Sequence, residues 1–169
     1  MNLQSVAWLC RVFDDAGLPF WIDGGWGVDA LLGKQTRSHG DLDLAVRYAD
    51  LPAFGSLLAP HGFHRAERDG DPEWNHVLQN VRGLAVDLHG FVLDSSGNAV
   101  LGDPADEAMY PAGALDGHGI IGGEPVRCIA APFVLAFRNA FTPRKVDWHD
   151  VELLCANFGL PVPSRYRER

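Results

Sequence analysis

Two aspartates, Asp41 and Asp43, stand in the segment DLDLAV, where polar and apolar residues alternate. Such alternation is typical of a β-strand with two different faces, and side chains at positions i and i+2 of a strand point to the same face. Two neighbouring carboxylates repel each other unless a cation lies between them. Because Mg²⁺ prefers oxygen ligands and commonly keeps phosphate oxygens in its shell, the pair indicates a magnesium site. An exposed pair on an edge strand would give the same pattern.

A third aspartate, Asp87, lies in the apolar context LAVDLHG. A charge in a buried strand needs a binding partner, because burying an unpaired charge is costly. Asp87 could complete the site of Asp41 and Asp43, and it could accept the proton of a substrate hydroxyl as a general base. Two magnesium ions about 3.5–4 Å apart can activate such a hydroxyl and stabilise a leaving group. The alternative is a surface-facing aspartate, with Val86 and Leu88 in the core.

Two glycines, Gly24 and Gly25, follow the apolar run PFWID. Glycines at the end of a strand let a phosphate approach the backbone closely, and the N–H groups of a following helix can bind an anion. A tight turn alone would also explain the two glycines. Arg37 and His39, just before the aspartate pair, could hold a triphosphate, since arginine is suited to bidentate phosphate contacts. Lys145, at the start of a C-terminal helix, could reach the same triphosphate.

The hydrophobic pattern distributes these residues over helices and strands. It predicts helices at 3–16, 26–32, 50–60, 131–141 and 146–158, and strands at 19–23, 41–46, 76–81, 84–90 and 125–129. Residues 94–123, rich in Gly, Asp and Pro, are predicted to form a long loop over the active face. The mixture indicates an α+β fold in one domain, residues 1–169, with the catalytic sheet and its helices over about 1–130 and C-terminal helices over about 131–160.

The charge and the cysteine content favour some classes of partner and compartment over others. The net charge of −8, with only two lysines, disfavours nucleic acid and suits a cationic substrate. No apolar run approaches the length of a membrane span. Three widely spaced cysteines and an N-terminus without a signal-peptide pattern indicate a reduced, cytoplasmic protein.

The segment WIDGGWGVDALLGKQTRSHGDLDL, followed later by a single aspartate on a strand, resembles the polymerase-beta-type nucleotidyltransferases. More narrowly, it resembles the small antibiotic nucleotidyltransferases of the lincosamide and aminoglycoside types. DLHGFVLDSSGN (87–98), with its Asp-x-His, is similar to the lincosamide branch, and 122–129 and 147–161 are similar to the C-terminal part of the group. The resemblance covers most of the chain and implies a polymerase-beta-like fold with a mixed sheet and flanking helices.

The resemblance also implies an activity: magnesium-dependent transfer of NMP, with AMP favoured, from an NTP such as ATP to a hydroxyl of a small antibiotic, with release of pyrophosphate. It implies that Asp41 and Asp43 hold the metal, that Asp87 is a metal ligand, the base or both, and that the two glycines, Arg37 and His39 bind the nucleotide. A lincosamide is favoured over an aminoglycoside as the acceptor. One departure is FRNAF at 137–141, where lincosamide-type relatives tend to carry a His and a Gly-Tyr pair.

Other functions fit parts of the same pattern. The chain could transfer a nucleotide to another metabolite or to a protein hydroxyl, or it could be a non-catalytic nucleotide-binding relative. Phe133, Phe137 and Phe141 recur at helical spacing and could line an apolar acceptor pocket, or they could simply face the core. The apolar C-terminal helix could support a homodimer.

Overall fold

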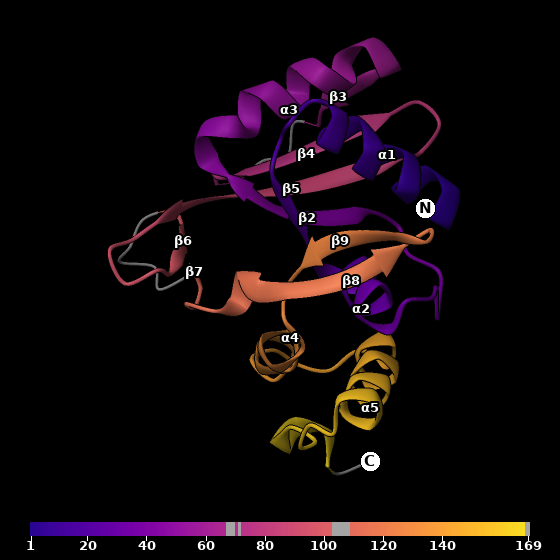
Figure 1. The fold of residues 1–169 in the computed structure, drawn as a ribbon, viewed down its shortest axis with the longest axis vertical. Coiled ribbons are helices and arrows are strands. Elements are labelled where there is room, and N and C mark those ends of the chain that lie inside the picture. The colour runs from indigo at the N-terminus through magenta and orange to yellow at the C-terminus, as the bar shows by residue number, and fades with distance from the viewer. Residues whose placement is uncertain (67–69, 71, 103–108, 168–169) are drawn as a thin grey trace.

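A computed structural model describes residues 1–66, 70, 72–102 and 109–167, and its centre is a mixed nine-stranded sheet (Figure 1). The strands are β1 (Phe20–Ile22), β2 (Leu42–Arg47), β3 (Phe63–Arg65), β4 (Asn75–Asn80), β5 (Ala85–Leu93), β6 (Ala99–Leu101), β7 (Met109–Tyr110), β8 (Gly117–Ile121) and β9 (Glu124–Cys128). The helices are α1 (Leu3–Asp15), α2 (Gly24–Leu32), α3 (Leu51–Leu58), α4 (Ala131–Arg138) and α5 (Lys145–Phe158).

The strands follow the order β3-β4-β5-β2-β1-β9-β8, with β6 pairing with β5 and β7 pairing with β6. β2 and β5 are parallel neighbours in the middle of the sheet, whereas β4 and β5 form an antiparallel hairpin. The predicted α+β class with a mixed sheet is therefore confirmed.

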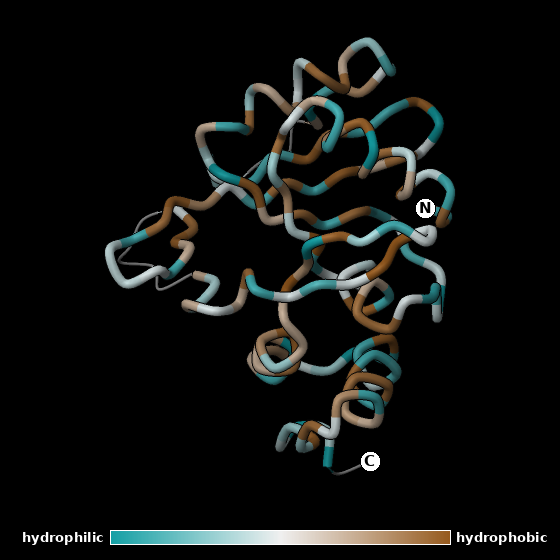
Figure 2. The backbone as a smooth tube through the Cα atoms, in the orientation of Figure 1, coloured by the Kyte–Doolittle hydropathy of each residue, from teal (hydrophilic) through white to brown (hydrophobic). Residues whose placement is uncertain are grey.

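Alternation along β2 places its side chains in two separate cores. Leu42, Leu44 and Val46 pack into a buried cluster with residues of α1 and α3, whereas Ala45 belongs to a second cluster with residues of α4 and α5. Figure 1 shows α1 and α3 at one end of the molecule and α4 and α5 at the other. Brown hydrophobic stretches run along the central strands in Figure 2 and alternate with teal stretches along the helices, as expected where each helix buries one side. Asp43 therefore shares the face of Ala45 rather than that of the leucines.

The predicted helices and strands all occur, with two shifts at their ends that affect the site. Helix α2 begins at Gly24 rather than at Trp26, because the side chain of Asp23 accepts a hydrogen bond from the Gly24 N–H and caps the helix. Strand β2 begins at Leu42, so Asp41 lies just before the strand rather than in it.

The prediction of a long loop over residues 94–123 is wrong. Within the described part of that segment lie β6, β7 and β8, and residues 103–108 fall outside the described residues. These strands are two to five residues long and are stabilised by their partners: β6 pairs with the end of β5, and β8 pairs with β9. Strands this short carry too few residues for a recognisable alternation, so their pattern alone does not predict them.

The helices of the described residues include none that is long and apolar enough to span a membrane. Cys10, Cys128 and Cys155 are all buried free thiols.

Candidate active site

The parallel pairing of β2 with β5 places Asp43 directly beside Asp87. His89 follows two residues after Asp87 and therefore lies on the same face of β5. One ligand atom from each of these three side chains lies within 4.8 Å of the other two. Asp41 is exposed and lines the same cavity as Asp43. The structure thus brings Asp43 and Asp87 together on adjacent strands and adds an imidazole to them.

The carboxylates of this group disfavour each other's ionised form. Burial, together with the nearby charges of Asp41 and Asp23, raises the pKa of Asp43 to about 7. Burial disfavours the charged form of His89, but its hydrogen bond with Asp87 and the charge of that carboxylate outweigh this effect and raise the pKa of His89. A divalent cation would relieve such repulsion. Carboxylate oxygens are the protein ligands that Mg²⁺ and Mn²⁺ prefer, so Asp43 and Asp87 fit the metal that the sequence implies, and His89 lies beside them.

Gly24 and Gly25 are required by the side chains that pack against them. A Cβ at Gly24, whose φ is 59°, would lie 1.9 Å from Oδ2 of Asp43, and a Cβ at Gly25 would lie 2.2 Å from Nδ1 of His39. Real Cβ atoms are essentially never this close to another heavy atom. The two glycines therefore let the side chains of Asp43 and His39 approach the start of α2 closely, which a side chain at either position would prevent.

Arg37 and His39 lie beside these glycines, and both are held by other side chains. Arg37 donates from Nε and from one terminal nitrogen to the two carboxylate oxygens of Asp150, both at 2.7 Å. The other terminal nitrogen lies 3.0 Å from Nδ1 of His39. Nε2 of His39 donates to Asp29 at 2.5 Å, since a carboxylate can only accept. Arg37 and His39 thus form one hydrogen-bonded unit at the mouth of the cavity, with Asp29 and Asp150 behind them.

Asp147 and Asp150 lie near the start of α5, but they do more than begin that helix. Asp147 does form a capping box with Arg144, but both aspartates are fully buried. Arg138 bridges them, with one terminal nitrogen 2.6 Å from Asp147 and the other 2.7 Å from Asp150. Burial by itself would favour protonation, but the hydrogen bonds from Arg144 and the charges of Arg138 and Arg144 hold the pKa of Asp147 below its usual value. Their position near a helix start hides this second role, because the arginine partners come from other elements.

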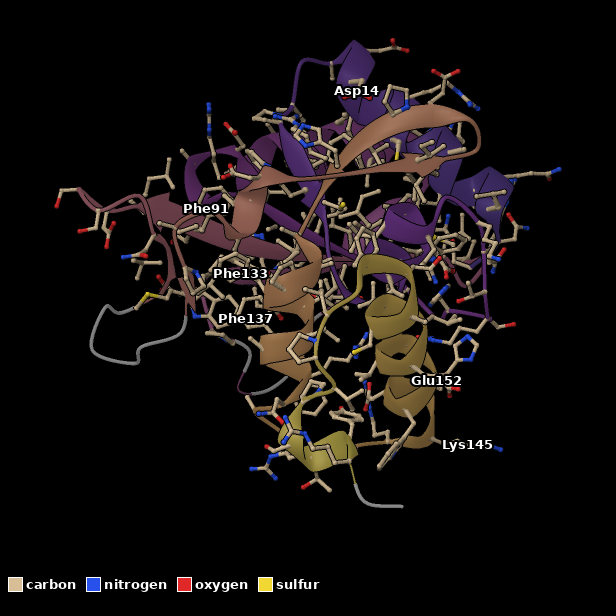
Figure 3. All side chains as sticks on the ribbon, turned by 60° about the horizontal axis from the view of Figure 1, so that its bottom comes forward. Asp14, Phe91, Phe133, Phe137, Lys145 and Glu152 are labelled. Atoms are coloured by element: carbon tan, nitrogen blue, oxygen red, sulfur yellow. The ribbon has the colours of Figure 1, made fainter. Side chains whose placement is uncertain are left out.

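A cavity of about 430 Å³ connects the carboxylate group with the C-terminal helices. Its polar side is formed by Asp23, both glycines, residues 37–41, Asp43 and His89, and its other side by Val134, Phe137, Arg138, Phe141, Arg144 and Val146. Figure 3 shows Phe133 and Phe137 on the same helix, and Phe137 is the one that lines the cavity. Lys145 is exposed, and Figure 3 shows it projecting outward from the start of α5. The structure therefore places Lys145 outside the cavity that its neighbours line.

Three further residues surround the site that the sequence did not single out. The side chain of Asn75 donates a hydrogen bond to Oδ1 of Asp87 at 2.5 Å. The hydroxyl of Tyr110 donates to Oδ2 of Asp23 at 2.9 Å and lies 3.2 Å from Nδ1 of His89. An aspartate just before two glycines is a helix-cap signal that could have identified Asp23. Nothing local marks Asn75 or Tyr110, because their partners are far away in the chain.

Comparison with known proteins places the chain in a family. Residues 5–154 match the family described as aminoglycoside-2''-adenylyltransferase. A lincosamide resistance protein of Staphylococcus haemolyticus is 46% identical over 151 residues, which cover 89% of this chain and 92% of the relative. A 2''-aminoglycoside nucleotidyltransferase of Escherichia coli is 29% identical over 164 residues, covering 86% and 81%.

Solved structures agree on the fold. The lincomycin-bound lincosamide antibiotic adenylyltransferase LnuA superimposes with a TM-score of 0.77 at 21% identity, covering 91% of this chain and 96% of LnuA. ANT(2'')-Ia in complex with adenylyl-2''-tobramycin gives a TM-score of 0.69 at 22% identity, covering 93% and 89%. Together with the paired aspartates beside a Gly-Gly helix start, these matches show that the chain is a nucleotidyltransferase of the aminoglycoside-2''-adenylyltransferase family.

Proposed function

We propose that this chain transfers AMP from ATP to a hydroxyl of a small cationic antibiotic, and that the acceptor is a lincosamide. The observation that carries the proposal is the pairing of Asp43 with Asp87 on adjacent strands, beside the start of α2, with Asp43 and His89 lining the cavity. A non-catalytic nucleotide-binding protein would have no use for carboxylates held so close that burial and repulsion raise the pKa of Asp43 to about 7.

The aspartates divide the work of the reaction in this proposal. Asp41, Asp43 and Asp87 hold magnesium, which when bound would neutralise phosphate charge and stabilise the leaving pyrophosphate. Asp87 accepts the proton of the acceptor hydroxyl while the oxygen of that hydroxyl forms a bond to the α-phosphorus of ATP. The bond from that phosphorus to the bridging oxygen of pyrophosphate breaks in the same displacement. The hydrogen bond from Asn75 orients the Asp87 carboxylate for this task.

The nucleotide would bind where α2 begins. Gly24 and Gly25 allow its phosphates to approach the backbone, and the first N–H groups of the helix lie at the same place. Arg37 and His39 stand beside them on the cavity wall, where Arg37 presents positive charge to the triphosphate and His39 holds Arg37 in place. Lys145 would contribute only if its side chain turned toward the cavity.

The charges of the C-terminal side favour an acceptor with few amines. Asp147 and Asp150 are buried and neutralised by arginines, so they do not offer free carboxylates to a polyamine. Phe137 and Phe141 line the same side of the cavity and provide apolar surface. A lincosamide carries one amine and an alkyl tail, whereas an aminoglycoside carries several amines and needs several carboxylates. The 46% identity to a lincosamide resistance protein supports the same choice.

A substrate screen tests the proposal. Purified protein with ATP and Mg²⁺ should release pyrophosphate when lincomycin is added and should do so far more slowly with tobramycin. Omission of Mg²⁺ should abolish the release. If tobramycin reacts and lincomycin does not, the choice of acceptor is wrong. If neither drug reacts while another hydroxyl compound does, the proposed antibiotic acceptor is wrong, and only the nucleotidyl transfer reaction is supported.

A further inference from the structure

Tyr110 occupies an unusual place for a residue on a two-residue strand. It lies on β7, which pairs with β6 beyond the end of β5, yet its side chain is only 4% exposed and reaches the carboxylate group. Its ring packs edge-on against Phe137 of the cavity wall, with 5.7 Å between ring centroids. A tyrosine this deeply buried normally finds a partner for its hydroxyl. Here the hydroxyl has two partners, and both belong to the site.

The direction of these two hydrogen bonds follows from the chemistry of the groups. A carboxylate only accepts, so the Tyr110 hydroxyl donates to Oδ2 of Asp23 at 2.9 Å. Burial and the charge of Asp23 raise the pKa of Tyr110 well above its usual value, so the hydroxyl keeps its proton. Its only proton is then committed to Asp23. The contact of 3.2 Å with His89 must therefore run from Nδ1–H of the imidazole to the tyrosine oxygen.

The contacts at its two ring nitrogens fix the orientation of His89. Nδ1 lies 3.2 Å from the oxygen of Tyr110. Nε2 lies 3.4 Å from Oδ1 of Asp87, within the same group as Asp43. The tyrosine thus holds the imidazole against the carboxylates from the far side of the ring, as partners of histidines at functional sites commonly do.

We propose that Tyr110 is a positioning residue of this active site. It holds His89 with Nε2 toward Asp87, and through Asp23 it ties this pair to the cap of helix α2. Asp87 on β5, the proposed base, and the start of α2, the proposed phosphate site, are thereby held in a fixed relative position. An in-line displacement requires such a fixed arrangement. The inference rests on the proposed role of Asp87 as the base.

Tyr110→Phe tests the proposal by removing the hydroxyl alone, and Tyr166→Phe is its matched control. Tyr166 is 5% exposed and donates one buried hydrogen bond to the backbone oxygen of Arg138, among the C-terminal helices. Both variants should lose similar thermal stability. Tyr110→Phe should lower kcat roughly tenfold or more, with the KM of each substrate near wild type. Tyr166→Phe should keep kcat. An unchanged kcat in Tyr110→Phe, or an equal loss in both variants, overturns the proposal.

The ring signals of His89 provide a second readout that needs no acceptor. In ¹H–¹⁵N spectra of histidine-labelled protein recorded without divalent cations, Tyr110→Phe should shift the ring signals of His89, and Tyr166→Phe should leave them at their wild-type positions. Signals of His89 that are the same in Tyr110→Phe and in the wild type overturn the inference. If Tyr110→Phe shifts these signals but the wild type modifies no antibiotic, the proposed function alone is contradicted.

Discussion

At the scale of single residues, the active site holds several carboxylates close enough together that each disfavours the ionised form of the others. Asp43 is the most affected member, because burial and the charges of Asp41 and Asp23 raise its pKa from 3.8 to about 7. Its folded-state pKa lies above the unfolded one, so the folded state binds more protons between these values. Stability therefore decreases as the pH rises through this window, and the ionised carboxylate destabilises the metal-free fold at neutral pH and above.

Asp43→Asn should abolish nucleotidyl transfer and leave the fold intact. The substitution removes a metal ligand, and it also removes the repulsion, so the melting temperature at pH 8 in the presence of a chelator should equal or exceed that of the wild type. Below about pH 4 the two proteins should melt alike at this site, because the aspartate is then protonated in both folded and unfolded chains. Turnover near the wild-type rate would exclude Asp43 from the mechanism.

At the scale of elements, one ion-pair network joins three parts of the chain. Asp150 of α5 accepts from Arg37, which lies between α2 and β2, and from Arg138 at the end of α4. This aspartate is fully buried, and Arg37 lines the cavity beside Gly24 and Gly25. The orientation of Arg37, which we propose to bind the triphosphate, therefore depends on a helix from the C-terminal part of the chain.

Asp150→Asn should lower the free energy of unfolding by about 3 kcal/mol, because removing one partner leaves buried arginines without their counter-charge. It should also raise the KM for ATP, since Arg37 loses the carboxylate that orients it. Denaturant unfolding and steady-state kinetics measure the two effects. Glu124→Gln, at an exposed position on β9, is the control and should stay within about 0.5 kcal/mol of the wild type. An Asp150→Asn protein as stable as this control would contradict a structural role for the network.

At the scale of the whole molecule, the net charge of −8 should attract the proposed cationic acceptor and repel the anionic nucleotide. A cationic acceptor is attracted to the acidic surface, whereas an anionic nucleotide is not. Added salt shortens the range of this attraction, since the Debye length falls from about 30 Å at 0.01 M to about 8 Å at 0.15 M.

The kcat/KM for lincomycin should therefore decrease as sodium chloride is raised over this range at saturating ATP and Mg²⁺. The kcat/KM for ATP should not decrease in parallel, because long-range repulsion between like charges is screened as well. Initial rates at a series of salt concentrations measure both. A value for lincomycin that is independent of salt would remove long-range attraction from the capture of the acceptor.

Local signals in the sequence determined much of this molecule. The alternation in DLDLAV assigned Asp43 to the face opposite Leu42 and Leu44, because the period of a strand is two residues. Helix periodicity and glycine stops located the five α-helices of the described residues to within a few residues. Such signals are readable because they depend on neighbours within a turn of helix or a few residues of strand.

Only the tertiary structure decided which side chains surround those aspartates. Arg37 pairs with Asp150 across 113 positions, and Tyr110 reaches Asp23 across 87. Neither residue can be identified from its local sequence, since an arginine in a loop and a tyrosine before a proline occur in many ordinary roles. Their roles arise from burial, which removes water as a competing partner and makes each hydrogen bond to a carboxylate strong enough to fix geometry. That condition is created by the packing of β7, α4 and α5 around the sheet, and no single segment of the sequence contains it.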